Sequence, residues 1–194
     1  TTQDTQLGGV FEYNGEGSGG QTDSYIVHIR PSEGVSSNAA VDVRGRITVG
    51  SGGPSSSYFA VVAPRIAMSG TADVAGSVAY VAAEAANITI SDNLFDIRVS
   101  EGTSVAEALT HSGSTIVATS AANQNIYMVA IPKNNAVSML VQGNLGFEAA
   151  TASVTSDGSI ILSAGRDIAG GGIDYEGDPS GDADIRIGTA GGNS

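Results

Sequence analysis

Residues 76–88 read Gly-Ser-Val-Ala-Tyr-Val-Ala-Ala-Glu-Ala-Ala-Asn-Ile, and two later stretches follow the same plan. These are Gly113-Ser-Thr-Ile-Val-Ala-Thr-Ser-Ala-Ala-Asn-Gln-Asn-Ile126 and Gly158-Ser-Ile-Ile-Leu-Ser-Ala-Gly-Arg-Asp-Ile168. Each has a Gly-Ser turn, a short strand of β-branched and small residues, a polar corner, and a new strand that opens with Ile. Strands and corners that recur without helices between them are typical of a solenoid, whose coils bury apolar side chains against one another. The stretches therefore predict an all-β fold, a β-solenoid, with a degenerate repeat.

The composition supports this prediction independently. Hydrophobic residues make up 41% of the chain, yet there is no Trp, and aromatic residues amount to only 5%. A compact globule needs bulky side chains to fill its centre, whereas the interior of a narrow stack is only about 10 Å across. Small and β-branched side chains fill such a space and suit a pleated surface.

The charge of the chain excludes several functions. The formal net charge is −12, with only eight basic residues, of which Lys133 is the single lysine. Sequence-independent binding of nucleic acid needs clustered Lys and Arg, and anionic membrane surfaces repel an acidic protein.

The sequence has no cysteine, and no apolar run approaches the ~20 residues of a membrane span. The N-terminal residues lack the pattern of a signal peptide, so either a signal peptide has been removed or the chain is a segment of a longer protein, and we favour the segment.

Apolar runs mark the expected strands, at 10–13, 25–30, 40–49 with a corner at Gly45, 58–63, 66–68, 72–74, 94–99, 114–119, 125–131, 137–141, 144–148, 152–155, 159–163 and 184–187. The run at 58–63 is apolar throughout, so we expect both of its faces to be covered. One segment differs: Ser104-Val-Ala-Glu107 matches a capping box and predicts a short helix near 104–111. We divide the chain into an N-terminal cap segment (1–40), solenoid coils (41–187) and a flexible tail (188–194).

Three stretches also carry a family resemblance. They are Tyr58-Phe-Ala-Val-Val-Ala-Pro-Arg-Ile-Ala-Met-Ser-Gly-Thr-Ala-Asp-Val-Ala-Gly-Ser-Val-Ala-Tyr-Val-Ala-Ala83, the segment 126–147 and the segment 158–168. Over roughly residues 40–170 the chain resembles filamentous-haemagglutinin-like exoproteins of bacterial two-partner secretion. The resemblance implies a right-handed parallel β-helix, export through an outer-membrane transporter partner, and a role in adhesion or biofilm matrix. The family's Asn-Pro-Asn-Gly-type phrase is absent, so we expect the transporter to recognise a region outside this chain.

The candidate metal ligands lie in the acidic segment 170–184. Its carboxylates are hard oxygen ligands on a glycine-rich backbone, as Ca²⁺ accepts: Asp174, Glu176, Asp178, Asp182 and Asp184. A solvated acidic loop explains the same pattern and is the favoured alternative, because runs of like charge are usually exposed. We predict no other cofactor.

The function expected from these observations is that of a secreted, non-catalytic structural segment. It would act at the bacterial cell surface as a stiff rod in an adhesin or matrix fibre. Its expected partners are host or neighbouring-cell surfaces or matrix polysaccharide, and we expect no nucleic acid and no membrane insertion. One alternative is a self-assembling filament subunit that associates through its end coils. Another is a β-helical polysaccharide-degrading enzyme, which would need clustered carboxylates, whereas the Asp residues here are dispersed. We expect roughly seven to nine coils.

Overall fold

The protein is all-β. A computed structural model describes residues 9–15, 25–31, 39–50, 57–91, 94–117, 124–134, 136–147, 159–169, 172–174 and 182–188. Within these ranges the chain forms nineteen strands and no helix. The strands form four sheets, of which three are parallel and one is antiparallel. Across the described residues, no helix is long and apolar enough to cross a membrane.

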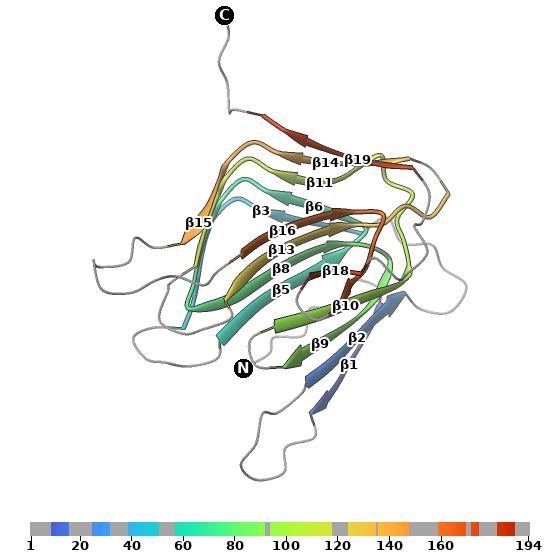
Figure 1. The fold of residues 1–194 in the computed structure, drawn as a ribbon, viewed down its shortest axis with the longest axis horizontal. Helices are drawn as coiled ribbons and strands as arrows, with labels where there is room; N and C mark the ends of the chain where they lie inside the picture. Colours follow the sequence, from blue (N-terminus) through green and yellow to red (C-terminus); the bar gives the residue numbers. More distant parts are fainter. Residues whose placement is uncertain are drawn as a thin grey trace, which may run out of the picture.

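The three parallel sheets share the chain in a regular way. Sheet B contains β3 (Ala40–Val43), β6 (Arg65–Met68), β11 (Glu107–His111), β14 (Val137–Val141) and β19 (Ala183–Ile187). Sheet C contains β4 (Arg46–Val49), β7 (Thr71–Val74), β12 (Ser114–Val117) and β15 (Asn144–Phe147). Sheet D contains β5 (Ser57–Ala63), β8 (Gly76–Ala82), β13 (Asn125–Ala130) and β16 (Ser159–Ala164). The chain passes through B, C and D in that order four times, and we call each passage a circuit; β19 begins a fifth (Figure 1).

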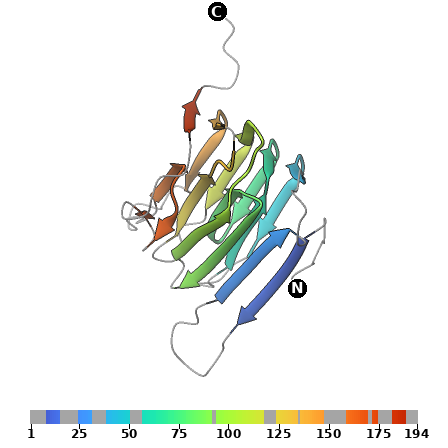
Figure 2. The ribbon, with the colours of Figure 1, turned by 90° about the vertical axis from the view of Figure 1, so that its right-hand side faces the viewer.

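The antiparallel sheet A lies outside these circuits. It is ordered β1 (Gly9–Gly15), β2 (Tyr25–Pro31), β9 (Ala85–Ser91), β10 (Leu94–Glu101), β17 (Ile168–Ala169) and β18 (Gly172–Ile173). The β9–β10 hairpin is an excursion at the end of the second circuit, and β2 pairs with β9. Figure 2 shows β1 and β2 (blue) beside this hairpin (green), while the parallel strands follow one another from cyan to orange.

The side chains of sheet D form two cores, one on each face. The inner core lies among sheets B, C and D, and it contains Ile66, Met68, Tyr80, Leu109 and Met139, all at most 1% exposed. The outer core lies between sheets D and A.

The outer core is built from the opposite face of the sheet D strands together with sheet A. It contains Val81, Phe95, Ile97, Tyr127 and Ile168, none of them exposed. Every residue of β8 and β13 is therefore buried. The expectation that the apolar run 58–63 is covered on both faces is confirmed: alternate side chains of β5 pack against the inner core and the outer core. Because β5 lies at the edge of sheet D, it is mostly half-buried.

A column of glycines turns the chain between sheets B and C. A Cβ atom added to Gly70, Gly113 or Gly143 would lie 2.0 Å from the carbonyl oxygen of the equivalent glycine one circuit earlier. The first glycine of the column, Gly45, has nothing within 4 Å of such an atom. The same oxygens accept hydrogen bonds from the next circuit, for example from Ser114 N to Gly70 O at 2.9 Å. The circuits approach so closely at this corner that only glycine fits.

The helix predicted near 104–111 is wrong. Glu107–His111 is strand β11, which pairs in parallel with β6 and β14. This pairing buries Ala108, Leu109 and His111. The capping-box pattern is a weak local preference, and the free energy of burying these side chains overrides it.

Two other expectations about the repeat also need correction. The described residues make four circuits, fewer than the seven to nine expected, because each circuit uses three strands. In addition, Gly113 lies at the corner before sheet C, whereas Gly76 opens a strand of sheet D. The three similar stretches are therefore not all equivalent. Of the predicted strands, 152–155 lies outside the described residues. The division at residues 40 and 188 stays a prediction.

Candidate functional site

A buried hydroxyl–imidazole pair lies in the inner core. The Thr115 Oγ1 atom is 2.9 Å from His111 Nε2 and 2.8 Å from the Tyr80 hydroxyl oxygen. Strand β12 positions Thr115, β11 positions His111, and β8 positions Tyr80. All three side chains point inward because they occupy the apolar columns of their sheets. A hydroxyl beside an imidazole is the arrangement of an activated nucleophile and its base.

Burial decides what this pair can do. Tyr80 and Thr115 are 0% exposed and His111 is 1% exposed, so no substrate reaches them in the folded state. Burial also lowers the pKa of His111 to about 4 and raises the pKa of Tyr80 to about 12. His111 Nδ1 is buried without a hydrogen-bond partner. The three residues therefore form a polar link within the core, with His111 neutral at physiological pH.

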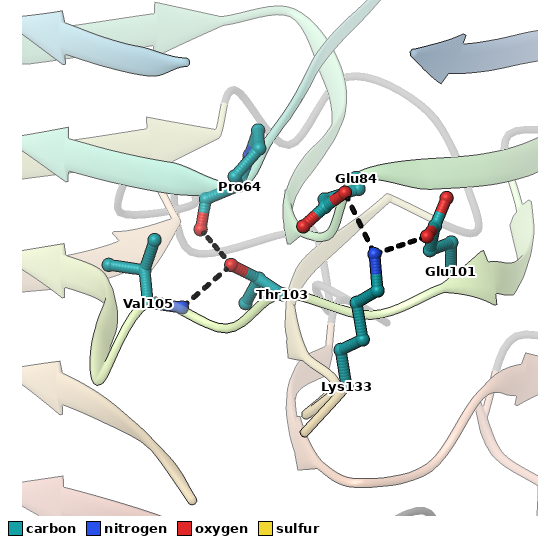
Figure 3. A network of polar contacts seen from close by, with 6 residues as sticks. All are labelled: Pro64, Glu84, Glu101, Thr103, Val105 and Lys133. Carbon is teal, nitrogen blue, oxygen red and sulfur yellow. Dashed lines mark hydrogen bonds and ion pairs between the residues drawn. The ribbon is translucent and has the colours of Figure 1, made fainter. Parts of the chain in front are cut away.

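A second polar cluster lies at the corner between sheets D and B, where the β9–β10 hairpin begins and ends (Figure 3). Lys133 Nζ contacts Glu84 Oε2 at 3.2 Å and also pairs with the Glu101 carboxylate. Glu84 precedes β9 and Glu101 ends β10, and the Glu84 amide donates a hydrogen bond to Glu101 O at 2.9 Å. The Glu101 carboxylate, with Glu84, raises the pKa of Lys133. The only lysine of the chain thus joins both ends of the hairpin to the third circuit.

Thr103 completes the same corner. Its Oγ1 donates a hydrogen bond to Pro64 O at 2.8 Å and accepts one from Val105 N at 3.1 Å. Its backbone forms a parallel bridge with Pro132. Figure 3 shows Thr103 between Pro64 and the ends of the hairpin. The corner therefore fixes the position of the hairpin over sheet D, and its chemistry is structural.

A polar column also marks the start of the sheet D strands. Asn125 N donates a hydrogen bond to Ser77 Oγ at 3.0 Å, and Asn125 Oδ1 accepts one from Ser159 N at 2.9 Å. The Asn125 side-chain amide also donates to the Tyr127 hydroxyl at 2.8 Å. Asn125 thus satisfies backbone and side-chain groups of three neighbouring strands.

Several charged residues on the surface of the described part of the chain form ion pairs. Arg44 Nε lies 2.8 Å from Asp42 Oδ2, and Arg46 pairs with Asp73 on the neighbouring strand. The Arg44 hydrogen bond lowers the pKa of Asp42. Pairs of this kind neutralise single carboxylates, and they do not bring two carboxyl groups together for acid–base catalysis.

Of the acidic residues predicted as calcium ligands, Asp174, Asp182 and Asp184 lie within the described residues. Asp174 lies 3.7 Å from Arg98, and Asp184 on β19 lies 2.8 Å from Arg186. Asp182 is exposed, and its carbonyl oxygen accepts a hydrogen bond from Val137 N. Glu176 and Asp178 lie outside the described residues. Within the part of the chain that the structure describes, no three acidic or histidine side chains form a possible metal site. Calcium binding stays a prediction.

Two features of these sites were missed from the sequence. His111 was assigned to a helix, which hid its place in the apolar column Val43–Met68–His111–Val141. The Lys133 cluster was missed because Glu84, Glu101 and Lys133 are far apart in the chain. A signal was available: an isolated lysine directly after Pro132 in a chain of net charge −12.

Comparisons of the chain with protein-family models, with curated proteins and with solved structures found no match. The arguments for function therefore come from the residues and the fold.

Proposed function

We propose that this chain is a stiff, non-catalytic segment of a secreted bacterial surface adhesin or extracellular matrix fibre. The observation that carries the proposal is the in-register stacking of four circuits. In sheet B, Val41, Ile66, Leu109, Met139 and Ile185 occupy one continuous column. Because the described strands of each circuit pair with those of the circuits before and after it, such a fold grows along one direction and resists bending.

The proposed architecture is a right-handed parallel β-helix. Each circuit connects two adjacent parallel strands of the same sheet through strands in two other sheets. About 98% of the connections between parallel strands of one sheet are right-handed, because the twist of the strands favours that direction. The inner core then takes the place of a central axis, and the glycine corners set the spacing of the circuits.

The surface supports a structural rather than a catalytic role. The one hydroxyl–imidazole contact described above is buried, and the exposed carboxylates of Asp42 and Asp184 are each paired with an arginine. A net charge of −12 keeps such a segment soluble. Adhesion through it would rest on many weak contacts along its length, to a cell surface or to matrix polysaccharide. Export would use an outer-membrane transporter partner.

Bead retention under flow tests the adhesive role. Beads coated with the whole chain at increasing density are passed over alginate, over dextran and over a cell monolayer, with albumin-coated beads as the control. We expect retention on at least one surface to rise more steeply than coat density, as multivalent binding requires, with no release of reducing sugar from the polysaccharides. Retention equal to that of albumin on all three surfaces would contradict the proposal, and release of sugar would favour the enzyme alternative.

A further inference from the structure

The exposed apolar side chains of the described residues gather at one end of the stack. The large hydrophobic side chains that are exposed are Ile160 (42%), Ile185 (37%) and Ile187 (75%). Ile160 lies on β16, the last strand of sheet D, and the other two lie on β19, the last strand of sheet B. The first-circuit strands β3, β4 and β5 expose no large hydrophobic side chain to this extent. The two ends of the stack therefore differ.

Strand β19 is an edge strand at this apolar end. It pairs with β14 in parallel register from Val137↔Ala183 to Val141↔Ile187, and among the described strands nothing pairs with its other edge. Ile185 extends the inner-core column of sheet B by one position, beyond Met139. Unpaired N–H and C=O groups beside apolar side chains form a template for another strand.

The sequence of β19 is complementary to itself. It reads Ala183-Asp184-Ile185-Arg186-Ile187. If two copies pair antiparallel about Ile185, then Asp184 of each copy lies opposite Arg186 of the other, and Ile185 lies opposite Ile185. Opposite charges and apolar side chains in directly facing positions both stabilise a strand pair. Within one chain, Asp184 and Arg186 pair with each other at an exposed site.

Head-to-tail stacking fits this end less well. In that arrangement β3 of a second copy would continue sheet B beyond β19. Among the described strands, however, sheets C and D end one circuit earlier, at β15 and β16. Strands β4 and β5 of the second copy would then be separated from β15 and β16 by the space of a missing strand, since strands are spaced by about 4.8 Å. A head-to-tail contact would also need an apolar surface at both ends.

We propose that β19 is a dimerisation edge, through which two copies of this chain pair antiparallel about a two-fold axis at Ile185. The pair joins two copies of the five-stranded sheet B into one continuous sheet. A two-fold contact uses the same surface on both copies, which matches a molecule with one apolar end. The proposal needs only the β19 edge and does not rest on the adhesive function.

Charge exchange at positions 184 and 186 tests the pairing by sedimentation velocity of the whole chain. Asp184→Arg gives a strand that carries only positive charge at the two positions, and Arg186→Asp gives one that carries only negative charge. We expect each single variant to weaken dimerisation about tenfold, since both facing pairs become like-charged. We expect an equimolar mixture of the two variants to form a mixed dimer, and the double variant to dimerise as the original chain does.

A cysteine cross-link tests the register, since the chain has no native cysteine. Ile185→Cys places the two thiols opposite each other, within the distance that a disulfide spans. Ile187→Cys is the matched control, because position 187 of one chain would lie four residues of strand, about 13 Å, from position 187 of the other chain. We expect oxidation to cross-link the Ile185→Cys chain and not the Ile187→Cys chain, although residue 187 is the more exposed.

Several outcomes overturn the proposal. One is a chain that stays monomeric at every concentration up to about 0.5 mM, which exceeds the dissociation constant of most specific complexes. Another is a single charge variant that associates as strongly as the original chain. Equal cross-linking at positions 185 and 187 would exclude the antiparallel register. Species that grow beyond the dimer with concentration would instead indicate head-to-tail assembly.

Discussion

The inner core and the outer core share sheet D, yet the chain assembles them in different ways. Each circuit adds one layer to the inner core, so a given position in sheet B is apolar in circuit after circuit. The outer core depends mainly on one excursion, the β9–β10 hairpin, with a short contribution from β17. The inner core therefore grows by contacts between successive circuits. The outer core instead needs contacts between sheet D and strands that lie outside the circuits.

The largest expected effect is on the corner glycines that space the inner core. Gly113→Val would place side-chain atoms against the Gly70 carbonyl, where an added Cβ already lies 2.0 Å from the oxygen. No flexible side chain can move aside, so we expect the free energy of unfolding to fall by more than about 4 kcal/mol. Urea denaturation measures this free energy of unfolding. Gly45→Ala is the control, with an expected change below about 0.5 kcal/mol, because the same position in the first circuit is open. Similar losses at both positions would contradict the stacking.

The outer core is tested by Phe95→Ala. Phe95 is fully buried, and its ring stacks on Tyr127 with centroids 5.4 Å apart. We expect the free energy of unfolding to fall by about 3 kcal/mol, because the substitution leaves a large cavity. Leu94→Ala on the same strand is the control, since Leu94 is half-buried and lies in neither core. If the hairpin alone detaches, hydrogen exchange will rise in β9 and β10 while β11 and β12 stay protected. A uniform rise would show that the two cores unfold together.

The buried histidine makes the inner core sensitive to acid. The folded-state pKa of His111 is lowered to about 4, below its ordinary value of 6.5, because burial disfavours the charged form. The unfolded chain therefore binds the proton first as the pH falls. The stability contributed by neutral His111 is complete above about pH 6.5 and is lost progressively between 6.5 and 4, in total about 2–3 kcal/mol.

The measurement is the difference in unfolding free energy between the original chain and His111→Gln at a series of pH values. The subtraction removes the contribution of carboxylates and of His28. We expect the advantage of the original chain to shrink by this amount as the pH falls from 6.5 to 4. A difference that stays constant with pH would show that His111 titrates as it does in water.

The smallest expected effects compare the two buried tyrosines. In the inner core, Tyr80→Phe removes one hydrogen bond to Thr115, which keeps its contact with His111, so we expect a loss of about 1 kcal/mol. In the outer core, the Tyr127 hydroxyl accepts hydrogen bonds from Asn125 Nδ2 and Phe95 N. Tyr127→Phe leaves both donors without this acceptor, and we expect the free energy of unfolding to fall by about 2 kcal/mol. Thermal unfolding of both variants gives the comparison, and a larger loss for Tyr80→Phe would reverse it.

The all-β class and the positions of most strands can be predicted from local patterns in the sequence. The alternation of Val41, Val43, Ile47 and Val49 about Gly45 gives β3 and β4, and the continuous apolar run at 58–63 gives β5. These features are local, because successive side chains of a strand point to opposite faces of the sheet. Alternating apolar residues therefore indicate one buried face, and a continuous apolar run indicates two.

Which repeats are equivalent, and where the polar clusters lie, depends on contacts between distant segments of the chain. The true equivalents are the corner glycines Gly45, Gly70, Gly113 and Gly143, which hairpins and loops of different length separate in the sequence. Residues 107–111 have a helical pattern and form a strand because β6 and β14 lie on either side. Lys133 meets Glu84 and Glu101 only because the chain returns to the same corner. Such contacts depend on the length and path of each circuit, which local patterns do not encode.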